Sequence, residues 1–177
     1  MKILTTPDPL LRRVALPVAK LDKKLTAQIA DMLKTLKSAK DPEGVGLAAP
    51  QVSINRRFFI VTFHGVPEIF INPTLSNFSK ATLLDVHRKS KDRWLEGCLS
   101  VPRLWGFVNR PYAVEIDYLT PADGNLEKRH RKLEDVDASY VQHENDHLNG
   151  ILFTDRILEQ GGEILKETPT GLIPIEM

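Results

Sequence analysis

The stretch His143-Glu144-Asn145-Asp146-His147 decides how this chain folds and what chemistry it carries. It lies in residues 135–149, where apolar side chains recur at three- and four-residue spacing up to Gly150, and this pattern predicts a helix. On such a helix the two histidines share one face and can bind one metal ion. Glu144 is then free to move a proton on a water molecule. The stretch predicts metal-assisted hydrolysis, with a solvated helix face as the alternative.

Two histidines need a third protein ligand if one coordination position is to stay open. Phe153 stands where the long metalloprotease motif has its third histidine, so that motif is not followed. Glu159, Glu163 and Glu167 are candidates of the thermolysin type, although they lie in a polar stretch. Cys98, the single cysteine, is the better candidate, because a thiolate and two imidazoles form a tetrahedral site with room for water. Inert packing and a papain-like nucleophile are the alternatives for this thiol.

A third segment, GVGLAAPQ at residues 44–51, combines two glycines with small apolar residues. This composition indicates backbone packed closely against another group, with the amide of Gln51 as a possible hydrogen-bond donor. A plain tight turn explains the segment equally well. A dinucleotide fingerprint is excluded, because Ala48 and Ala49 replace the required third glycine.

Taken together, GVGLAAPQ (44–51), EGCLS (96–100) and QHENDHLNG (142–150) resemble the three signature motifs of the peptide deformylases. The resemblance covers nearly the whole chain and includes ILTTPDPLLRR near the N-terminus and the Ile-Asn-Pro triplet at residues 71–73. It implies removal of the formyl group from the N-terminal formyl-methionine of newly made bacterial or organellar proteins.

The resemblance also implies a role for individual residues. The positions that match metal ligands are Cys98, His143 and His147, the general acid/base is Glu144, and the donors to the reacting oxygen are the Gln51 amide and the backbone N–H of Leu99. The family uses one divalent metal ion, natively Fe²⁺, with Zn²⁺, Ni²⁺ or Co²⁺ able to replace it. A thiolate with two imidazoles would by itself indicate zinc.

The family's methionine side-chain pocket matches Val45, Trp94, Val136 and Tyr140, and each of these is equally well explained as a core residue. Gly46 and Leu99 are expected to leave too little space beside the metal for an acetyl group, so the formyl group is favoured. Two other functions stay open. One is a zincin-type metallopeptidase, and the other is an inactive, metal-stabilised binding domain, against which an intact Glu144 argues.

Composition fits a small enzyme. The 177 residues contain no repeat or linker, so we expect one catalytic domain over residues 1–177. The net charge of +1 does not favour specific nucleic-acid binding, and no stretch is apolar enough for a membrane span. A single cysteine and the absence of a signal-like N-terminus predict a cytoplasmic location. The expected partners are formyl-Met nascent peptides and, transiently, the ribosome.

The predicted fold is α+β, with short, mostly antiparallel strands packed around a central helix that carries HExxH, plus an N-terminal amphipathic helix at residues 23–39. Strands are predicted at residues 57–63, 68–71, 106–109, 113–119 and 126–133, with a turn at 121–124.

Two segments depart from the family pattern. Residues 77–93 are long and locally basic, and we expect a solvated loop or hairpin there, with contact to the ribosome or substrate as the alternative. Residues 155–177 contain two prolines and several glutamates. They do not resemble the basic C-terminal helix with which some family members dock on ribosomes.

Overall fold

The computed structural model describes residues 1–40, 43–87 and 94–175. Its strands form two antiparallel sheets with the orders β1-β2-β3-β6-β7 and β4-β5-β8-β9. In the first sheet the strands are β1 (Gly46–Ala48), β2 (Phe58–Phe63), β3 (Val66–Ser76), β6 (Ala113–Ala122) and β7 (Asn125–Glu134). In the second they are β4 (Glu96–Cys98), β5 (Val101–Gly106), β8 (Ile164–Thr168) and β9 (Gly171–Ile175).

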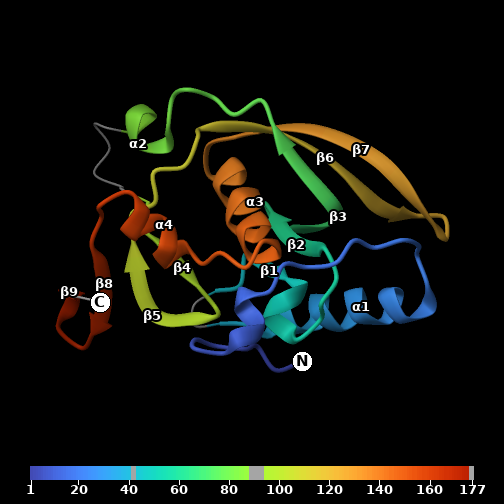
Figure 1. The fold of residues 1–177 in the computed structure, drawn as a ribbon, viewed down its shortest axis with the longest axis horizontal. Coiled ribbons are helices and arrows are strands. Elements are labelled where there is room, and N and C mark those ends of the chain that lie inside the picture. The colour runs from blue at the N-terminus through green and yellow to red at the C-terminus, as the bar shows by residue number, and fades with distance from the viewer. Residues whose placement is uncertain (41–42, 88–93, 176–177) are drawn as a thin grey trace.

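The helices are α1 (Lys23–Ser38), α2 (Leu83–Val86), α3 (Asp135–Leu148) and α4 (Phe153–Glu159), with 3-10 turns η1 (Pro9–Arg12) and η2 (Ala49–Val52). Helix α3 stands in the middle of the molecule, between the five-stranded sheet and the β4–β5 part of the second sheet (Figure 1). The predicted α+β fold with a central helix is therefore confirmed. Within the described residues, no helix combines the length and apolar character needed to cross a membrane.

Strand β2 shows how the sequence positions the two long helices. Its side chains alternate between the two faces of the sheet, as in any strand. Phe58 and Ile60 belong to the buried cluster that includes the apolar face of α1. Phe59 and Val61 belong to the cluster that includes α3. A nearly continuous apolar strand is thus required, because helices cover the sheet on both faces.

Most predicted elements are present, but the strand predicted at 106–109 is wrong. Strand β5 ends at Gly106, where the side chain of Ile157 from α4 fills the space that a Cβ would need. Its extent is set by pairing with β4 and β8, which an apolar run cannot reveal. The turn predicted at 121–124 is narrower, because only Asp123 and Gly124, with φ of 47° and 80°, connect β6 and β7.

Three segments have more regular structure than the sequence indicated. The GVGLAAPQ segment is a strand followed by a 3-10 turn rather than a plain turn. Within residues 77–93, Thr82 and Asp85 form a capping box that begins the short helix α2, and residues 88–93 lie outside the described part. The tail forms α4 and the β8–β9 hairpin, so it contains no long C-terminal helix within its described residues.

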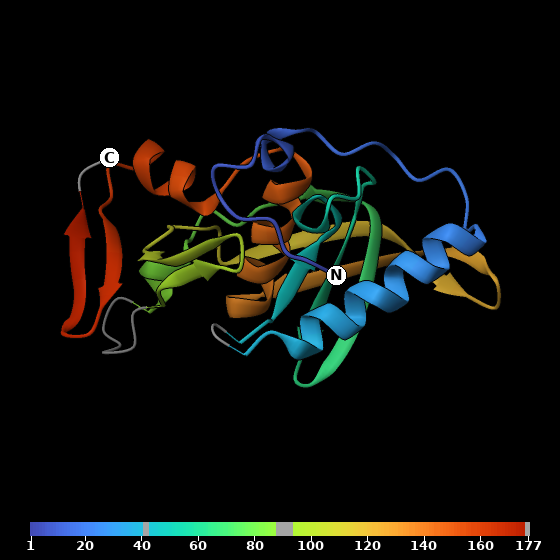
Figure 2. The same ribbon diagram turned by 90° about the horizontal axis from the view of Figure 1, so that it is seen from below.

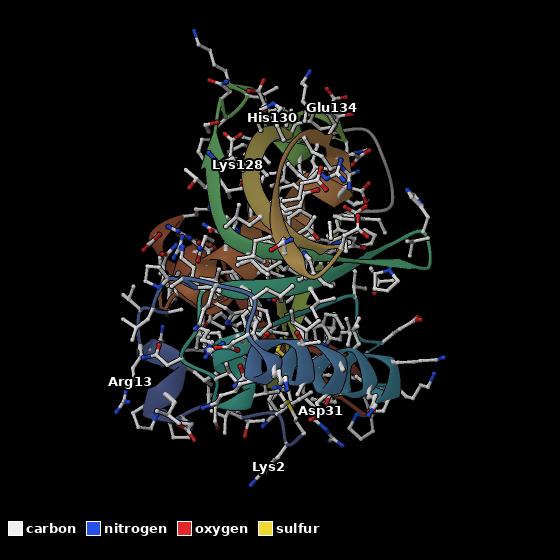
Figure 3. All side chains as sticks on the ribbon, turned by 90° about the vertical axis from the view of Figure 1, so that its right-hand side faces the viewer. Lys2, Arg13, Asp31, Lys128, His130 and Glu134 are labelled. Carbon is white, nitrogen blue, oxygen red and sulfur yellow. The ribbon has the colours of Figure 1, made fainter. Side chains whose placement is uncertain are left out.

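Many of the charged and ionisable side chains lie on the outer surfaces of these layers. Figure 3 shows Asp31 on α1 and Lys128, His130 and Glu134 on β7 at the periphery of the molecule, and all four are exposed. His130 contacts Asp117 on the neighbouring strand at 3.0 Å. Charged side chains on the outermost strand β7 discourage pairing with a strand of another molecule.

We predict that Gly150→Ala destabilises the protein by about 2 kcal/mol or more, because a left-handed conformation alone costs ~1–2 kcal/mol in an L-residue. Gly150 ends α3 with a φ of 73°, and a Cβ there would lie 2.5 Å from the backbone oxygen of Arg12. Gly161→Ala is the matched control, since its φ is 67° but nothing lies within 4 Å of the added carbon. Urea denaturation gives the free energy of unfolding of both variants. Equal losses of stability would show that the backbone at Arg12 moves away from the added Cβ without an energetic cost.

Candidate metal centre

Three distant segments place polar side chains around one point. Cys98 ends β4, whereas His143 and His147 lie one turn apart on α3. All three are buried, and their ligand atoms lie within 4.8 Å of one another. This is the sole such group of His, Cys, Asp and Glu side chains in the described part of the chain. Helix α3 contributes both imidazoles because an i, i+4 pair shares one helix face.

The sulfur of Cys98 lies in a polar environment suited to a thiolate. The Nε2 atom of His147 is 3.2 Å from Sγ. The backbone N–H of Ser100 donates to Sγ at 3.4 Å, and the side-chain amide of Gln51 donates at 3.6 Å. Donors aimed at sulfur stabilise negative charge on it. The environment therefore favours a metal ligand over an inert buried thiol.

The imidazole of His143 is oriented by Glu96. Its Nδ1 atom is 2.5 Å from Oε1 of Glu96, so Nδ1–H donates to the carboxylate and Nε2 is left for a metal. Burial lowers the pKa of His143, but the negative charges of Glu96 and Cys98 outweigh burial and raise this pKa well above its ordinary value. An environment that favours a proton on this ring also favours a metal cation beside it.

Glu96 belongs to a buried ion-pair network. Arg110 donates to its two carboxylate oxygens at 2.8 and 2.7 Å and to Asp146 at 2.9 Å. Asp146 also accepts from Arg156 at 2.7 Å. Burial would raise the pKa of Glu96, but the charges of Arg110 and His143 hold this pKa well below its usual range. Glu96 is therefore a carboxylate, and it keeps His143 in the tautomer that exposes Nε2.

Glu96, Arg110 and Asp146 support the site but were not predicted from the sequence. A signal was present for two of them, because Glu96 lies two residues before Cys98 and Asp146 directly precedes His147. Carboxylates next to metal ligands in the sequence are candidates for the second layer around a metal. Arg110 carries no such signal, because it lies between strands and reaches both carboxylates only in the folded chain.

Glu144 has the properties of a general base. Burial raises the pKa of its carboxyl to about 7. Its Oε2 atom is buried and has no hydrogen-bond partner among the described residues. Gly46 makes room for this carboxylate, because a Cβ at position 46 would overlap it. A carboxyl group with a pKa near neutrality can accept a proton and return it during one reaction cycle.

Gln51 is held with its amide hydrogens toward Cys98 and Ser100. Its Oε1 atom accepts the backbone N–H of Ala48 at 2.7 Å, and its Nε2 donates to Ser100 Oγ at 3.0 Å. These two bonds fix which end of the amide carries the donors. Leu99 lines the same cavity, directly after Cys98. Both predicted oxyanion donors therefore lie at the site.

A cavity of about 390 Å³ opens beside these groups. Four of the five predicted substrate-contacting residues line it: Val45, Gly46, Trp94 and Tyr140. The rings of Trp94 and Tyr140 meet edge to face with centroids 6.0 Å apart. Val136 is not among the lining residues, because it lies one turn before Tyr140 toward the start of α3. Other lining residues, which the sequence did not indicate, are Gly97, Trp105 and Ser139.

The sequence and the fold both match known proteins. A family profile described as polypeptide deformylase matches residues 1–162. The chain belongs to the peptide deformylase family. Peptide deformylase 1 of Clostridium acetobutylicum is 39% identical over 155 residues, covering 88% of this chain and 93% of that protein. The peptide deformylase of Natranaerobius thermophilus is 39% identical over 160 residues, covering 89% and 92%.

Solved peptide deformylases also share the fold. The Thermotoga maritima enzyme superposes with a TM-score of 0.74 at 36% identity and covers 88% of this chain and 95% of that chain. The Synechococcus elongatus enzyme, in complex with actinonin, gives 0.75 at 30% identity and covers 99% and 91%. These matches favour a deformylase over a zincin-type metallopeptidase or an inactive binding domain.

The glutamates that were candidates for a third ligand of the thermolysin type form contacts elsewhere or are exposed. Glu159 pairs with Arg156 at 3.0 Å, and Glu167 accepts from the indole N–H of Trp105 at 3.2 Å. Glu163 is exposed, between α4 and β8. None belongs to the group of potential ligands found in the described chain.

We predict that Glu96→Gln lowers metal affinity about 10- to 100-fold, the usual effect of removing a residue that orients a metal ligand. The amide keeps the size of Glu96 but removes the charge that favours a cation at His143. Glu68→Gln is the control, because Glu68 pairs with Arg131 in a partly exposed ion pair away from the cavity. Chelator competition on protein with native circular dichroism gives the affinity, and an unchanged value for Glu96→Gln would contradict the role assigned to it.

Proposed function

We propose that this chain hydrolyses the formyl amide of N-terminal formyl-methionine peptides in the cavity beside Cys98, His143 and His147. The observation that carries the proposal is the convergence of their three ligand atoms within 4.8 Å, next to the unpaired carboxylate oxygen of Glu144. Family membership supports the class of amide, and the geometry supports the role that we propose for each residue.

One divalent ion bound by the three side chains is part of the proposal. It would supply Lewis acidity, making water a nucleophile near neutral pH. The donors fit such an ion, since the N–H groups around Cys98 favour a thiolate and Glu96 favours a cation at His143. We propose Fe²⁺ as the native ion, with Zn²⁺, Ni²⁺ or Co²⁺ as ions that the same donors accept. Metal analysis of anaerobically prepared protein tests this choice.

Glu144 moves the proton. Its carboxylate takes a proton from the attacking water and returns it to the leaving amine, which must be protonated before the C–N bond breaks. The pKa of about 7 suits both transfers. Because Gly46 has no side chain, the Glu144 carboxylate can lie against β1, where a Cβ would overlap it.

Gln51 and Leu99 meet the charge that develops on the formyl oxygen. Ala48 and Ser100 orient the Gln51 amide, and the amide hydrogen that is directed at Cys98 Sγ over 3.6 Å would turn to the oxygen as it becomes negative. We assign the second donor to the backbone N–H of Leu99, in the turn between β4 and β5. Donors of this kind are usually worth about 10²- to 10³-fold in rate.

The peptide itself fits between two sheet edges. Strand β1 ends one sheet and β4 ends the other, and residues of both line the cavity. The outer backbone groups of such strands are free to pair with an extended peptide. The methionine side chain would lie against the apolar wall made by Val45, Trp94 and Tyr140.

Formylated chains are made on ribosomes, so the proposal includes transient contact with the ribosome. A cysteine that serves as a thiolate ligand suits a reducing compartment, and this supports the proposal that the protein acts in the cytoplasm. The formylated substrate is the reason for proposing ribosome contact, and the Cys98 thiolate is the reason for proposing the cytoplasm.

Two variants separate metal binding from chemistry. We predict that Cys98→Ala loses most bound metal, whereas Glu144→Gln keeps the metal and loses at least about 100-fold in kcat, because an amide accepts no proton. Metal content and formate release are measured on the same preparations. Full metal content in Cys98→Ala would overturn the ligand assignment, and near-normal turnover by Glu144→Gln would show that another base acts.

We predict that formyl-Met-Ala-Ser is deformylated while acetyl-Met-Ala-Ser reacts at least about tenfold more slowly, because forcing one extra methyl into a packed site costs ~1–3 kcal/mol. The space beside Gly46 is already filled by Glu144, so the acyl carbon has little room for a substituent. The two peptides differ by this methyl alone and are compared by kcat/KM on one metal-loaded preparation. Equal values, or cleavage of internal peptide bonds, would favour a general amidase or peptidase.

A further inference from the structure

The C-terminal hairpin adds two strands to the sheet that carries Cys98. Strands β8 and β9 follow β5 in the order β4-β5-β8-β9, and they lie beyond residue 162, where the family match ends. Figures 1 and 2 both show the hairpin at the end of the molecule opposite α1. Ile164 of β8 is buried in the cluster that includes Ile157 of α4, so packing anchors this strand to the rest of the protein.

The side chain of Trp105 joins three strands of this sheet. It starts from β5, and its six-membered ring covers Gly97 of β4, where an added Cβ would lie 2.5 Å from Cζ3 of the ring. The indole N–H, at the opposite end of the ring system, donates to Glu167 of β8 at 3.2 Å. An indole has a single N–H donor, so this bond sets the orientation of the ring.

The strand register explains why Glu167 reaches the indole. Trp105 pairs directly with Leu165, and directly paired residues point to the same face of a sheet. Glu167 follows Leu165 by two residues and therefore points to that face as well. It is the diagonal neighbour of Trp105, at a separation that long side chains can bridge. The hairpin thus places a carboxylate where it holds one end of the ring.

The covered glycine lies where the proposed function places the peptide. Among the described strands, β4 ends its sheet, and its outer edge can pair with an extended peptide. A peptide residue opposite Gly97 would point its side chain to the face on which a Gly97 Cβ would lie. The Trp105 ring occupies that face and lines the cavity. The ring therefore reaches over β4 to the peptide, and the peptide does not need to cross β5.

The ring is available to a residue that follows the methionine. In the proposed function the methionine side chain lies against Val45, Trp94 and Tyr140, which form another part of the cavity wall. Successive side chains of an extended peptide point to opposite faces, so one of the next two residues points toward the ring. An aromatic ring offers apolar surface, which binds an apolar side chain better than a hydroxyl group.

We propose that Glu167 is a positioning residue for the peptide: it holds the Trp105 ring over Gly97, and the ring so held favours an apolar side chain at one of the two residues after the methionine. The inference rests on the proposed function. Glu167 is exposed and lies outside the described residues that line the cavity, so it acts through the indole and not on the substrate. Without this hydrogen bond the ring is free to turn away from Gly97.

The test compares formyl-Met-Leu-Leu with formyl-Met-Ser-Ser, with formyl-Met-Ala as reference. For the unmodified protein we expect kcat/KM to be about threefold or more higher for the leucine peptide, because contact with the ring buries part of a leucine side chain. The difference should lie in KM, since this contact is the same in the ground and transition states. A ratio of one between the two tripeptides would overturn the proposal.

Variants of β8 show whether Glu167 acts through its hydrogen bond. We expect Glu167→Ala to lower the ratio about twofold or more by raising KM for the leucine peptide. Glu167→Gln should keep the ratio, because the amide oxygen still accepts the indole N–H. Lys166→Ala is the matched control and should also keep it, since Lys166 is exposed on the same strand but points to the opposite face. An unchanged ratio in Glu167→Ala, or an equal loss in either of the other two variants, would overturn the proposal.

Trp105→Phe separates this hydrogen bond from any other effect of Glu167. Phenylalanine keeps an aromatic ring but has no N–H to donate. Adding Glu167→Ala to Trp105→Phe should therefore change the ratio no further, because the two residues act as one unit. A second loss as large as that in the unmodified background would show that Glu167 acts by another route, and it would overturn the proposal.

The failure of this inference is distinguishable from failure of the proposed function. Turnover of formyl-Met-Ala, with a tripeptide ratio that Glu167→Ala leaves unchanged, rejects the positioning role alone. No formate release from any of the three peptides by iron- or nickel-loaded protein rejects the deformylase function, and the positioning role with it.

Discussion

The buried ion pairs of Arg110 are the interaction on which the site depends. One guanidinium joins Glu96 at the end of a sheet to Asp146 on the central helix, and all three side chains are at least 90% buried. Buried charges are stable only when each finds its partners with good geometry. Strand β4 and helix α3 are therefore held in one relative position, the one in which Glu96 also reaches the imidazole of His143.

Helix α3 both packs against the five-stranded sheet and carries the two histidines, because different faces of the helix carry apolar and polar side chains. Val141 and Leu148 pack in the cluster beneath the five-stranded sheet. His143 and His147, on another face, meet Cys98 from the second sheet. Most of the buried polar groups on this helix have a protein partner or face the cluster of potential ligands, although Nδ1 of His147 has no partner among the described residues. Packing against the sheet supplies the rigidity that a metal site with fixed geometry requires.

The cavity exists because two sheets present open edges to each other across this helix. Gly46 on one edge gives space to Glu144, and Gly97 on the other gives space to the ring of Trp105. The smallest residue is used in both strands where a side chain from another element must approach the backbone. The carboxylate of Glu144 and the ring of Trp105 can take these positions because the two strands carry no side chain there.

Local sequence determined much of this protein. The helical spacing of His143, Glu144 and His147 and the alternation in β2 predicted the central helix, the ligand pair and the α+β class, because both periodicities are properties of the backbone. Cys98 could be predicted as the third ligand because a thiolate and two imidazoles form a tetrahedral site with room for water. The tertiary structure alone decided the rest: the end of β5 at Gly106, the ion pairs of Arg110, the exclusion of Val136 and the hairpin that holds Trp105. These depend on partners far along the chain, such as Glu167 for Trp105 at a separation of 62 residues, and no local pattern encodes which distant groups will meet.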